Sequence, residues 1–357
     1  MEITVEEAIN YTDITYIDVR SPGEYYEASI PGAVNIPLFN DREQEELGII
    51  YHQLGENEAR LRALAIAAPK LPAMVDKIRS VCGTKTPLIY CYRGGLRSLS
   101  LYQILNLGGV TCLRLKKGYK AYRKHVSRRL ASYSLKQKMF VLNGLTGVGK
   151  TALLSRINEK ACPTIDIEGL ARHRGSVFGT IGIKDTRSQK DFDALLLQQL
   201  DGYSNGGFPY IVVEGEGRRI GNVYLPTFLS QAMAGGCHIL LTASLETRVR
   251  RILDTYLPSP MQPEIEKQLI NSISQLKNRL GSKKTADLIT MLEAADYYTV
   301  VKILCSDYYD RLYSDSRPDC SSFAYTVEAE NLETAADEII EIINNEVEEM
   351  PNRDEAY

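Results

Sequence analysis

The segment from Gly144 to Thr151 limits what this chain can fold into more than any other stretch. Its residues follow the spacing Gly-x4-Gly-Lys-Thr. A β-type run at 139–142 precedes it, and an amphipathic helical pattern at 152–157 follows it. A strand, a glycine loop and a helix in this order are typical of a phosphate-binding loop. We therefore predict an α/β domain built around a phosphate or diphosphate ligand.

Each part of this loop has a chemical purpose. Glycine lets backbone N–H groups approach phosphate oxygens without a Cβ in the way, and the next helix presents its positive end to the same anion. Lys150 adds a full charge, and the Thr151 hydroxyl is suited to hold Mg²⁺. An ordinary glycine turn before a helix is the alternative, and it explains less of the pattern. The predicted phosphate-binding residues are Gly144, Thr146, Gly147, Val148, Gly149, Lys150 and Thr151.

Composition sets broad limits on the rest of the chain. A length of 357 residues, with 44% hydrophobic and 24% charged residues, suggests two or three globular domains. No apolar run approaches the ~18 residues of a membrane span, and the acidic start is unlike a signal peptide. Seven dispersed cysteines without a C-x-x-C pair predict reduced thiols in a cytoplasmic protein. With a net charge of −3, RNA binding would need a local basic patch.

Residues 1–130 alternate between strand and helix patterns, which predicts a parallel α/β sheet. The predicted strands cover 16–20, 33–37, 87–90 and 110–115, and a capping box at Thr4 starts the first short helix. Helical patterns cover 41–53, 57–80 and 99–105, and prolines interrupt the second of these near 69 and 72. We expect the second pattern to bury an apolar face made of Ala59, Leu61, Leu64, Ala65 and Ala68.

The strand at 87–90 leads into a loop at 91–98 that begins with Cys91. Loop N–H groups, a following helix N-terminus and the guanidinium groups of Arg93 and Arg97 all favour thiolate over thiol. A buried, inert cysteine is the alternative, but the Gly94-Gly95 pair and the arginines favour a reactive thiol in an oxyanion-binding loop. The predicted catalytic residues are Cys91, Arg93 and Arg97. We expect the other cysteines to be packing residues: Cys82, Cys112, Cys162, Cys237, Cys305 and Cys320.

The first domain resembles a rhodanese domain. The likeness rests on Asp18-Val-Arg-Ser-Pro-Gly-Glu-Tyr25, on Ile30-Pro-Gly-Ala-Val-Asn-Ile-Pro37 and on the strand that ends in Cys91. Rhodaneses carry sulfur as a persulfide on this cysteine. The resemblance implies the same kind of chalcogen chemistry at Cys91, with thiosulfate or selenophosphate as the oxyanion.

A basic segment at 116–129 joins the two domains, and residues 131–138 end this linker. It contains no acid, and Tyr119 and Tyr122 lie among its cations. Basic side chains neutralise phosphates and aromatic rings stack on unpaired bases, whereas most charge runs are simply solvated helix faces. In an otherwise acidic chain the segment favours RNA binding. The residues predicted to bind RNA here are Lys116, Lys117, Lys120, Arg123 and Lys124.

Residues 139–310 continue the phosphate-binding domain. The strand at 208–214 ends in Glu214, a candidate Mg²⁺ ligand beside Thr151, and Glu216 is the next choice. A further strand is predicted at 237–244. Two loops are rich in cations that could clamp an anion; these residues are Arg172, His173, Arg174, Arg218 and Arg219. Residues 311–357 are predicted to complete this domain with a strand at 323–327 and a helix capped by Asn331.

Taken together, the motifs resemble those of the tRNA 2-selenouridine synthase family over nearly the whole chain. The remaining marks are Ile167-Glu-Gly-Leu-Ala-Arg-His-Arg-Gly, Val213-Glu-Gly-Glu-Gly-Arg-Arg-Ile-Gly and Leu280-Gly-Ser-Lys-Lys-Thr. Tyr92 stands where tryptophan is expected, and Gly215 stands where aspartate is expected. The resemblance implies a rhodanese-like parallel-sheet domain followed by a P-loop NTPase-like α/β domain.

The same resemblance implies a function in tRNA modification. A geranyl group passes from geranyl diphosphate to the sulfur of wobble 2-thiouridine, and selenium from selenophosphate then replaces the S-geranyl group. Cys91 is implied in the selenium step, and no tightly bound cofactor is expected apart from a candidate Mg²⁺. Two alternatives stay open: a persulfide sulfurtransferase coupled to an ATP-dependent kinase-like domain, and a phosphate-sensing module with an inert rhodanese fold.

Overall fold

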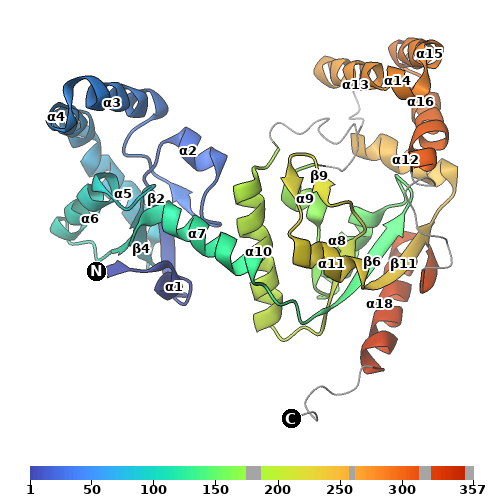
Figure 1. The fold of residues 1–357 in the computed structure, drawn as a ribbon, viewed down its shortest axis with the longest axis horizontal. Coiled ribbons are helices and arrows are strands. Elements are labelled where there is room, and N and C mark those ends of the chain that lie inside the picture. Colours follow the sequence, from blue (N-terminus) through green and yellow to red (C-terminus); the bar gives the residue numbers. More distant parts are fainter. Residues whose placement is uncertain (174–185, 257–261, 313–322, 350–357) are drawn as a thin grey trace. The chain divides into compact units, whose positions relative to one another are not determined.

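The computed structural model describes residues 1–173, 186–256, 262–312 and 323–349 (Figure 1). The chain forms two compact units. The first consists of Met1–Ser132 with Ser188–Gln198, and the second of Tyr133–Arg187 with Gln199–Tyr357. Among the described residues no helix combines the length and the apolar character needed to cross a membrane.

A five-stranded parallel sheet forms the centre of the first unit, as its alternating pattern predicts. The strand order is β1-β5-β4-β2-β3, and all neighbouring pairs are parallel. The strands are β1 (Glu2–Ile3), β2 (Ile14–Asp18), β3 (Val34–Asn35), β4 (Thr86–Tyr90) and β5 (Leu113–Leu115). The helices are α1 (Val5–Ala8), α2 (Pro22–Glu27), α3 (Asp41–Leu54), α4 (Glu56–Ala67), η1 (Ala68–Lys70), α5 (Leu71–Cys82), α6 (Leu96–Leu107) and α7 (Gly118–Ala131).

Local sequence signals place several of these helix ends. The predicted capping box at Thr4 is present, and Ser21 and Asn40 make the same reciprocal bonds at the starts of α2 and α3. Around Pro69 and Pro72 the predicted interruption appears as the 3₁₀ turn η1 between α4 and α5. The central strands then divide the core between two faces: Leu88 and Tyr90 of β4 pack on one, and Ile89 packs on the other.

The predicted apolar face of α4 is wrong except at Ala59, which is buried. Leu61 and Leu64 are each 63% exposed, and Ala65 and Ala68 are exposed as well. α4 instead turns a neighbouring stripe towards the core, made of Ala59, Ala63, Ile66 and Ala67. Both stripes contain three alanines, so side-chain size does not distinguish them, and packing against the rest of the unit decides which one is buried.

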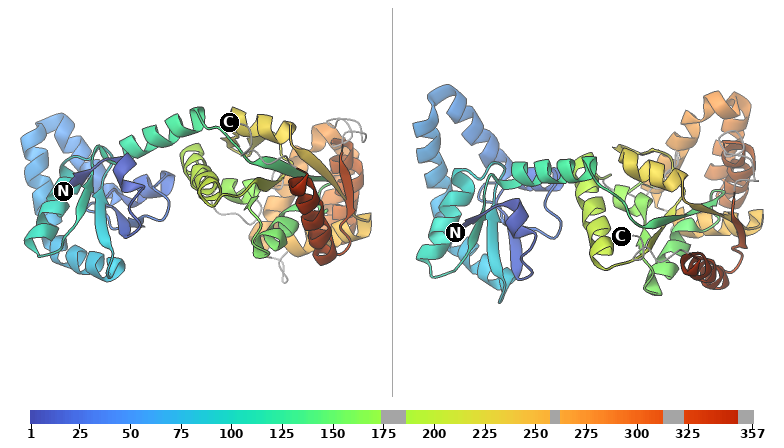
Figure 2. Two further views of the ribbon diagram at one scale, coloured as in Figure 1. Left: turned by 90° about the horizontal axis from the view of Figure 1, so that it is seen from below. Right: turned by 60° about the horizontal axis from the view of Figure 1, so that its bottom comes forward.

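The second unit is built on another five-stranded parallel sheet, with the order β12-β11-β6-β8-β7. Figure 2 shows the C-terminal helix, in dark red, beside this sheet. Its strands are β6 (Lys138–Gly144), β7 (Thr164–Ile165), β8 (Tyr210–Glu214), β11 (Cys237–Thr242) and β12 (Tyr325–Glu328), and β9 (Arg219–Ile220) and β10 (Val223–Tyr224) form a separate hairpin. The helices near the sheet are α8 (Lys150–Glu159), α9 (Ile167–Ala171), α10 (Gln189–Asn205, whose first part belongs to the first unit), α11 (Thr227–Ala234), α12 (Leu245–Tyr256) and α18 (Leu332–Glu348).

The strand that carries the glycine loop, β6, lies in the middle of this sheet between β8 and β11. α8 follows the loop directly and shares one hydrophobic core with α18, through Leu153 and Ile157 of α8 and Ile339 of α18. The predicted C-terminal strand and helix are both present, and Asn331 caps α18 as expected. β12 forms one edge of the sheet that carries the glycine loop.

A group of helices follows α12 in the chain and has a core of its own. It consists of α13 (Pro263–Gln275), α14 (Lys277–Leu280), α15 (Ser282–Glu293), α16 (Tyr297–Leu304) and the π-helical turn η2 (Cys305–Tyr309). Ile273, Leu288 and Leu304 pack together in this core, together with the ring of Tyr308. Directly after η2, Asp310 bonds Arg248 of α12.

A buried ion pair braces the first unit near Cys91. Arg20 and Asp18 are 2% and 0% exposed, and Arg20 Nη2 lies 2.6 Å from Asp18 Oδ2. Arg20 also donates to the Ala28 carbonyl, and its guanidinium lies 4.2 Å from the ring centroid of Tyr119. A single buried charge is costly, so each partner depends on the other.

Arg20→Met should destabilise the first unit by ~3–5 kcal/mol, because it leaves the Asp18 carboxylate buried without its partner. Urea denaturation followed by hydrogen exchange of β2 and β4 measures the loss. The double variant Asp18→Asn/Arg20→Met should lose clearly less, since it buries no unpaired charge. Wild-type stability in Arg20→Met alone would contradict this account.

Candidate functional site

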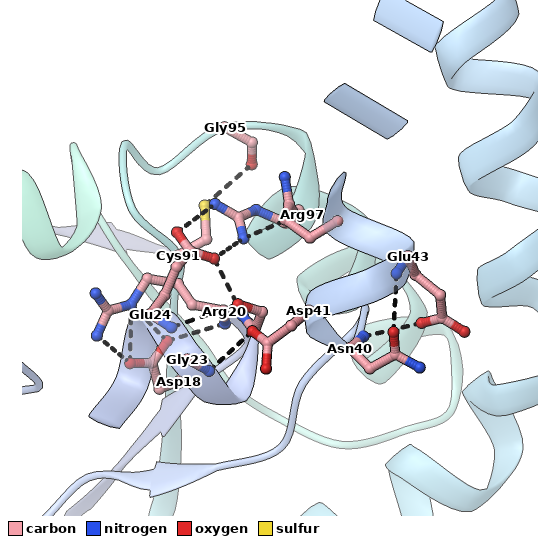
Figure 3. Close-up of polar contacts among 12 residues, drawn as sticks. Asp18, Arg20, Gly23, Glu24, Asn40, Asp41, Glu43, Cys91, Gly95 and Arg97 are labelled. Carbon is pink, nitrogen blue, oxygen red and sulfur yellow. Dashed lines mark hydrogen bonds and ion pairs between the residues drawn. The ribbon is translucent and has the colours of Figure 1, made fainter. Parts of the chain in front are cut away.

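Cys91 lies at the carboxyl end of β4, where the chain turns towards α6 (Figure 3). The residue is 2% exposed, and its Sγ donates to the Ser98 Oγ at 3.2 Å. Ser98 is fully buried and donates in turn to the Gly95 carbonyl at 3.2 Å. The motif contains Ser98, but sequence reasoning did not single it out as a site residue. Its hydroxyl fixes the direction of the sulfur within the loop.

The charge of Arg97 is compensated by a carboxylate. Its guanidinium bonds Glu24 at 2.5 and 3.2 Å and the Gln44 amide oxygen at 3.2 Å. Burial by itself raises the pKa of Glu24, but the bond and charge of Arg97 bring that pKa below its usual value. Arg97 therefore ties the Cys91 loop to α2 and α3 (Figure 3), and sequence reasoning missed both of its partners.

Arg93, by contrast, is exposed, and its side chain has no polar partner among the described residues. Of the two predicted loop cations, it is the one that an incoming anion can reach without breaking an ion pair. Arg93 and Arg97 thus differ in what they offer the site: Arg93 offers charge, and Arg97 offers rigidity.

The start of α7 is attached to the same loop. The N–H groups of Tyr119 and Lys120 donate to the carbonyl oxygens of Cys91 and Tyr92, each at 2.9 Å. Gly118 makes this approach possible, because it has φ +56° and a Cβ there would lie 2.1 Å from the Cys91 oxygen. The basic segment is therefore a helix that begins against the Cys91 loop.

The predicted tRNA-binding cations of this segment differ in their ion pairing and in their exposure to solvent. Arg123 pairs with Asp193 of the same unit at 2.7 Å. The exposed lysines are Lys116, Lys117, Lys120 and Lys124. These four lysines remain the candidates for phosphate contacts.

The expected stacking role of Tyr119 is wrong. This ring is only 4% exposed and belongs to the core beneath Arg20, and burial raises the pKa of Tyr119 to about 12. Tyr122 is packed against the same core, and burial raises its pKa too. The ring that reaches solvent is Tyr92, 40% exposed and inside the Cys91 loop.

The other described cysteines fit a packing role to different degrees. Burial raises the pKa of Cys112 and of Cys305 to about 11, which keeps both thiols protonated and inert. Cys82 is buried as well, whereas Cys162 and Cys237 are half-buried beside the core of the second unit. Cys320 lies outside the described residues.

The predicted phosphate-binding residues form one continuous loop from β6 into α8. Gly147 and Gly149 have φ of +82° and +101°, which favours glycine at both positions. Lys150 Nζ donates to the Gly144 carbonyl at 3.3 Å and lies 3.9 Å from a Glu216 oxygen. The ammonium group is thus held at the mouth of the loop, where a phosphate would take the place of these partners.

Glu214 ends β8 beside this loop, as predicted. Its Oε2 accepts from the Thr151 hydroxyl at 3.3 Å, and its Oε1 accepts from the Glu168 N–H at 2.8 Å. The side chain is fully buried, and burial, reinforced by the negative charges of Glu168, Asp166 and Glu216, raises the pKa of Glu214 well above its usual value. An excess of carboxylate here is unfavourable unless a cation balances it.

This arrangement fits the predicted Mg²⁺. Thr151 and Glu214 offer two neighbouring oxygen ligands, and Mg²⁺ commonly takes one or two protein ligands with water and phosphate completing its shell. No group of three or more metal-ligating His, Cys, Asp or Glu side chains occurs in the described part of the chain, so phosphate and water would have to supply the remaining ligands.

Four predicted anion-binding residues lie on two neighbouring loops of the second unit. His173 packs against Gly221 in the β9–β10 turn, where a Cβ would lie 2.5 Å from its ring. Burial lowers the pKa of His173, so the ring is mainly neutral at pH 7 and adds little charge. Arg172 and Arg218 are exposed, while Arg219 donates to the Gly221 carbonyl at 3.0 Å. Arg174 lies outside the described residues.

A thiol loop on one parallel sheet and a glycine phosphate loop on another define a class of protein: a rhodanese-like domain joined to a P-loop domain. Comparison with known families agrees. Residues 4–125 match the rhodanese-like domain, and residues 137–337 match the tRNA 2-selenouridine synthase AAA domain. The chain belongs to the tRNA 2-selenouridine synthase family.

Relatives of this family match over most of the chain. A tRNA 2-selenouridine synthase of Cupriavidus pinatubonensis is 32% identical over 327 residues, covering 84% of this chain and 87% of the relative. One of Pseudomonas fluorescens is 31% identical over 345 residues, covering 89% of this chain and 92% of the relative. Among solved structures, the N-terminal domain of an ATP/GTP binding protein of Clostridium difficile 630 is 36% identical, with a TM-score of 0.34, and covers 35% of this chain and 98% of that one.

The raised pKa of Glu214 predicts how stability depends on pH. The folded state keeps a proton on Glu214 at pH values where the unfolded state, with a pKa near 4.5, has lost it. Stability without Mg²⁺ should therefore fall as pH rises above ~4.5, towards the raised folded pKa. Glu214→Gln should weaken this dependence. Thermal unfolding over a pH series checks both.

Mg²⁺ with inorganic pyrophosphate should oppose the loss of stability at higher pH in the wild type. It should do so much less in Glu214→Gln. Asp201→Asn, a carboxylate of α10 outside the loop, serves as the charge control. An identical pH dependence in Glu214→Gln and the wild type would contradict the assignment of the buried acid.

Proposed function

We propose that this protein is an enzyme that converts wobble 2-thiouridine of tRNA to 2-selenouridine in two steps. In the first, the thiouridine sulfur takes a geranyl group from geranyl diphosphate. In the second, selenium from selenophosphate replaces the S-geranyl group. The observation that carries this proposal is a thiol loop and a diphosphate-type loop in one chain whose relatives, over 84–92% of the compared lengths, are named tRNA 2-selenouridine synthases.

The P-loop suits the first step. A bond forms between sulfur and the geranyl C1 while the C1–O bond breaks, and the electron pair leaves on diphosphate. Negative charge therefore grows on the diphosphate oxygens in the transition state. Loop N–H groups and Lys150 would stabilise that charge, and a Mg²⁺ held by Thr151 and Glu214 would add to this stabilisation when bound. This step consumes no ATP.

The Cys91 loop suits the second step. Geranylation turns the uridine sulfur into a thioether, which leaves C2 more readily than the original thiocarbonyl sulfur. Selenium of selenophosphate then forms a bond to C2 while the C2–S bond breaks and geranyl thiolate leaves. Water takes up the phosphoryl group as the Se–P bond breaks, so that phosphate is released. We assign the binding of selenophosphate to this loop, with Arg93 as its available cation, and we assign Cys91 to the selenium transfer.

Basic residues at α7 suit the placement of tRNA. The exposed lysines of this segment lie where α7 meets the Cys91 loop, because Tyr119 and Lys120 donate to that loop directly. A phosphate backbone bound along these lysines would bring an unpaired base to the loop, and Tyr92 is the exposed ring there.

The two sites should separate in mutants. Cys91→Ala should abolish selenation and leave S-geranylated uridine to accumulate. Lys150→Ala should slow geranyl transfer by ~100-fold, as is common when one charge-stabilising donor is lost, and should leave selenation of pre-geranylated tRNA intact. Mass spectrometry of digested tRNA measures both products. Cys162→Ala is the control for Cys91→Ala, and a Cys91→Ala variant that stops both steps equally would refute this division.

The lysines of α7 should control tRNA affinity. Lys120 and Lys124 lie one turn apart on this helix, and Lys120→Glu/Lys124→Glu should weaken tRNA binding. The slope of log K against log salt should flatten by about one to two, since each phosphate contact contributes roughly 0.7–0.9. Filter binding over a salt series measures this slope.

Lys77→Glu/Lys85→Glu is the matched control, with the same change in net charge. Lys77 is on α5, and Lys85 precedes β4 at the end of the strand opposite Cys91. Equal losses in the two double variants would show that net charge, and not the α7 surface, governs binding.

A further inference from the structure

The carbonyl oxygens of the P-loop are held by two arginines that the proposed function does not yet use. Arg248 Nη1 donates to the Thr146 carbonyl at 3.3 Å, and Arg251 Nη1 donates to the Val148 carbonyl at 2.6 Å. Both arginines come from α12, one turn apart, so that a single helix face reaches two positions of the loop.

These contacts fix the orientation of two peptide units in the loop. In a trans peptide the C=O of one residue and the N–H of the next point in opposite directions. Holding the Thr146 oxygen on the α12 side therefore points the Gly147 N–H away from α12, and holding the Val148 oxygen does the same for the Gly149 N–H. The N–H of Val148, between them, is already bonded to the Leu145 carbonyl at 3.1 Å.

The two N–H groups directed in this way are unused in the structure. Neither the Gly147 N–H nor the Gly149 N–H has a hydrogen-bond partner in the described residues. Both glycines are half-buried, and two such donors beside Lys150 suit an anion that would accept from them.

Each arginine is itself anchored. Arg248 is 4% exposed and forms two bonds of 2.8 Å with the Asp310 carboxylate, just after η2. Arg251 Nη2 donates to the carbonyl oxygens of Ala329 and Glu330 at 2.7 and 3.1 Å, between β12 and α18. The helical group and the C-terminal segment thus hold the arginines that hold the loop.

We propose that Arg248 and Arg251 are positioning residues of the phosphate loop, which aim the N–H groups of Gly147 and Gly149 at the diphosphate. This inference rests on the proposed function, in which the loop binds the diphosphate of the geranyl donor. Neither arginine touches the ligand. They act by fixing the orientation of two peptide units, and they leave Lys150 and the loop N–H groups to make the contacts.

The test uses the full chain and inorganic pyrophosphate with Mg²⁺ in isothermal titration. Arg251→Gln should weaken pyrophosphate binding by ~10-fold, the range expected for one misdirected charge-assisted hydrogen bond. Arg251→Lys should be nearly as weak, because one ammonium cannot span the carbonyls of Val148 and Ala329. This conservative variant separates orientation from charge.

Arg250→Gln is the matched control. Arg250 lies between the two arginines in sequence, is exposed and has no polar partner among the described side chains. It carries the same charge change without a loop contact, and its affinity should stay within about twofold of the wild type, as expected for an exposed surface charge. Asp310→Asn, which frees Arg248 without replacing it, should weaken binding several-fold.

Wild-type affinity in Arg251→Lys, or an equal loss in Arg250→Gln and Arg251→Gln, would overturn the positioning role. A variant that fails to fold would show a lower thermal midpoint and lose selenation of pre-geranylated tRNA. In that case the pyrophosphate affinity of Asp310→Asn tests the positioning role instead. Lys150→Ala keeps the two hypotheses apart. If Lys150→Ala abolishes binding and the α12 variants do not, only the positioning role fails. If the wild type binds neither pyrophosphate nor geranyl diphosphate, the proposed function fails with it.

Discussion

Both candidate sites depend on loop carbonyl oxygens being bound from outside the loop. At Cys91, the first N–H groups of α7 take the carbonyls of residues 91 and 92, and Arg114 takes the Gly94 carbonyl at 2.7 Å. At the P-loop, two arginines of α12 take the carbonyls of residues 146 and 148. A peptide unit whose oxygen is held outward presents its N–H inward. The two loops follow different strands in different sheets, yet each meets the same requirement of an anion site.

Charge is the second constraint, and it acts differently in the two units. In the first, Arg20 and Arg97 each face a carboxylate, so their charges brace the fold, and of the two predicted loop arginines Arg93 is the one left for an anion. In the second, burial of Glu214, together with the negative charges of its acidic neighbours, raises the pKa of Glu214. The first site would therefore suit an anion, while the second would suit an anion together with a cation.

Local patterns were sufficient for much of the secondary structure. Helix starts at Thr4 and Asn331 followed from side chains that bond their own first turn, and the break near Pro69 followed from a missing N–H and a steric clash. Such signals act within a few residues, so a single sequence displays them. The order of strands and helices likewise indicated parallel sheets, because parallel strands need long connections.

Errors arose where two local solutions were equally good. α4 carries two apolar stripes, and only packing against the rest of the unit decided that Leu61 and Leu64 face solvent. The basic segment has two tyrosines, but the contact between Arg20 and Tyr119, almost a hundred positions apart, places one ring in the core. Counting cations likewise overstated the free charge, since the partner of Arg97 is 73 positions away in the chain.

The sequence by itself determined the two chemical motifs, the strands that carry them and the family to which the chain belongs, because those depend on residue type and short spacing. The tertiary structure alone decided which side chains serve a ligand and which serve the fold. Glu24, Arg248 and Arg251 acquire their roles only when distant segments meet. Hydrogen bonds and ion pairs act over a few ångströms in space, and separation along the chain does not reveal which groups will come that close.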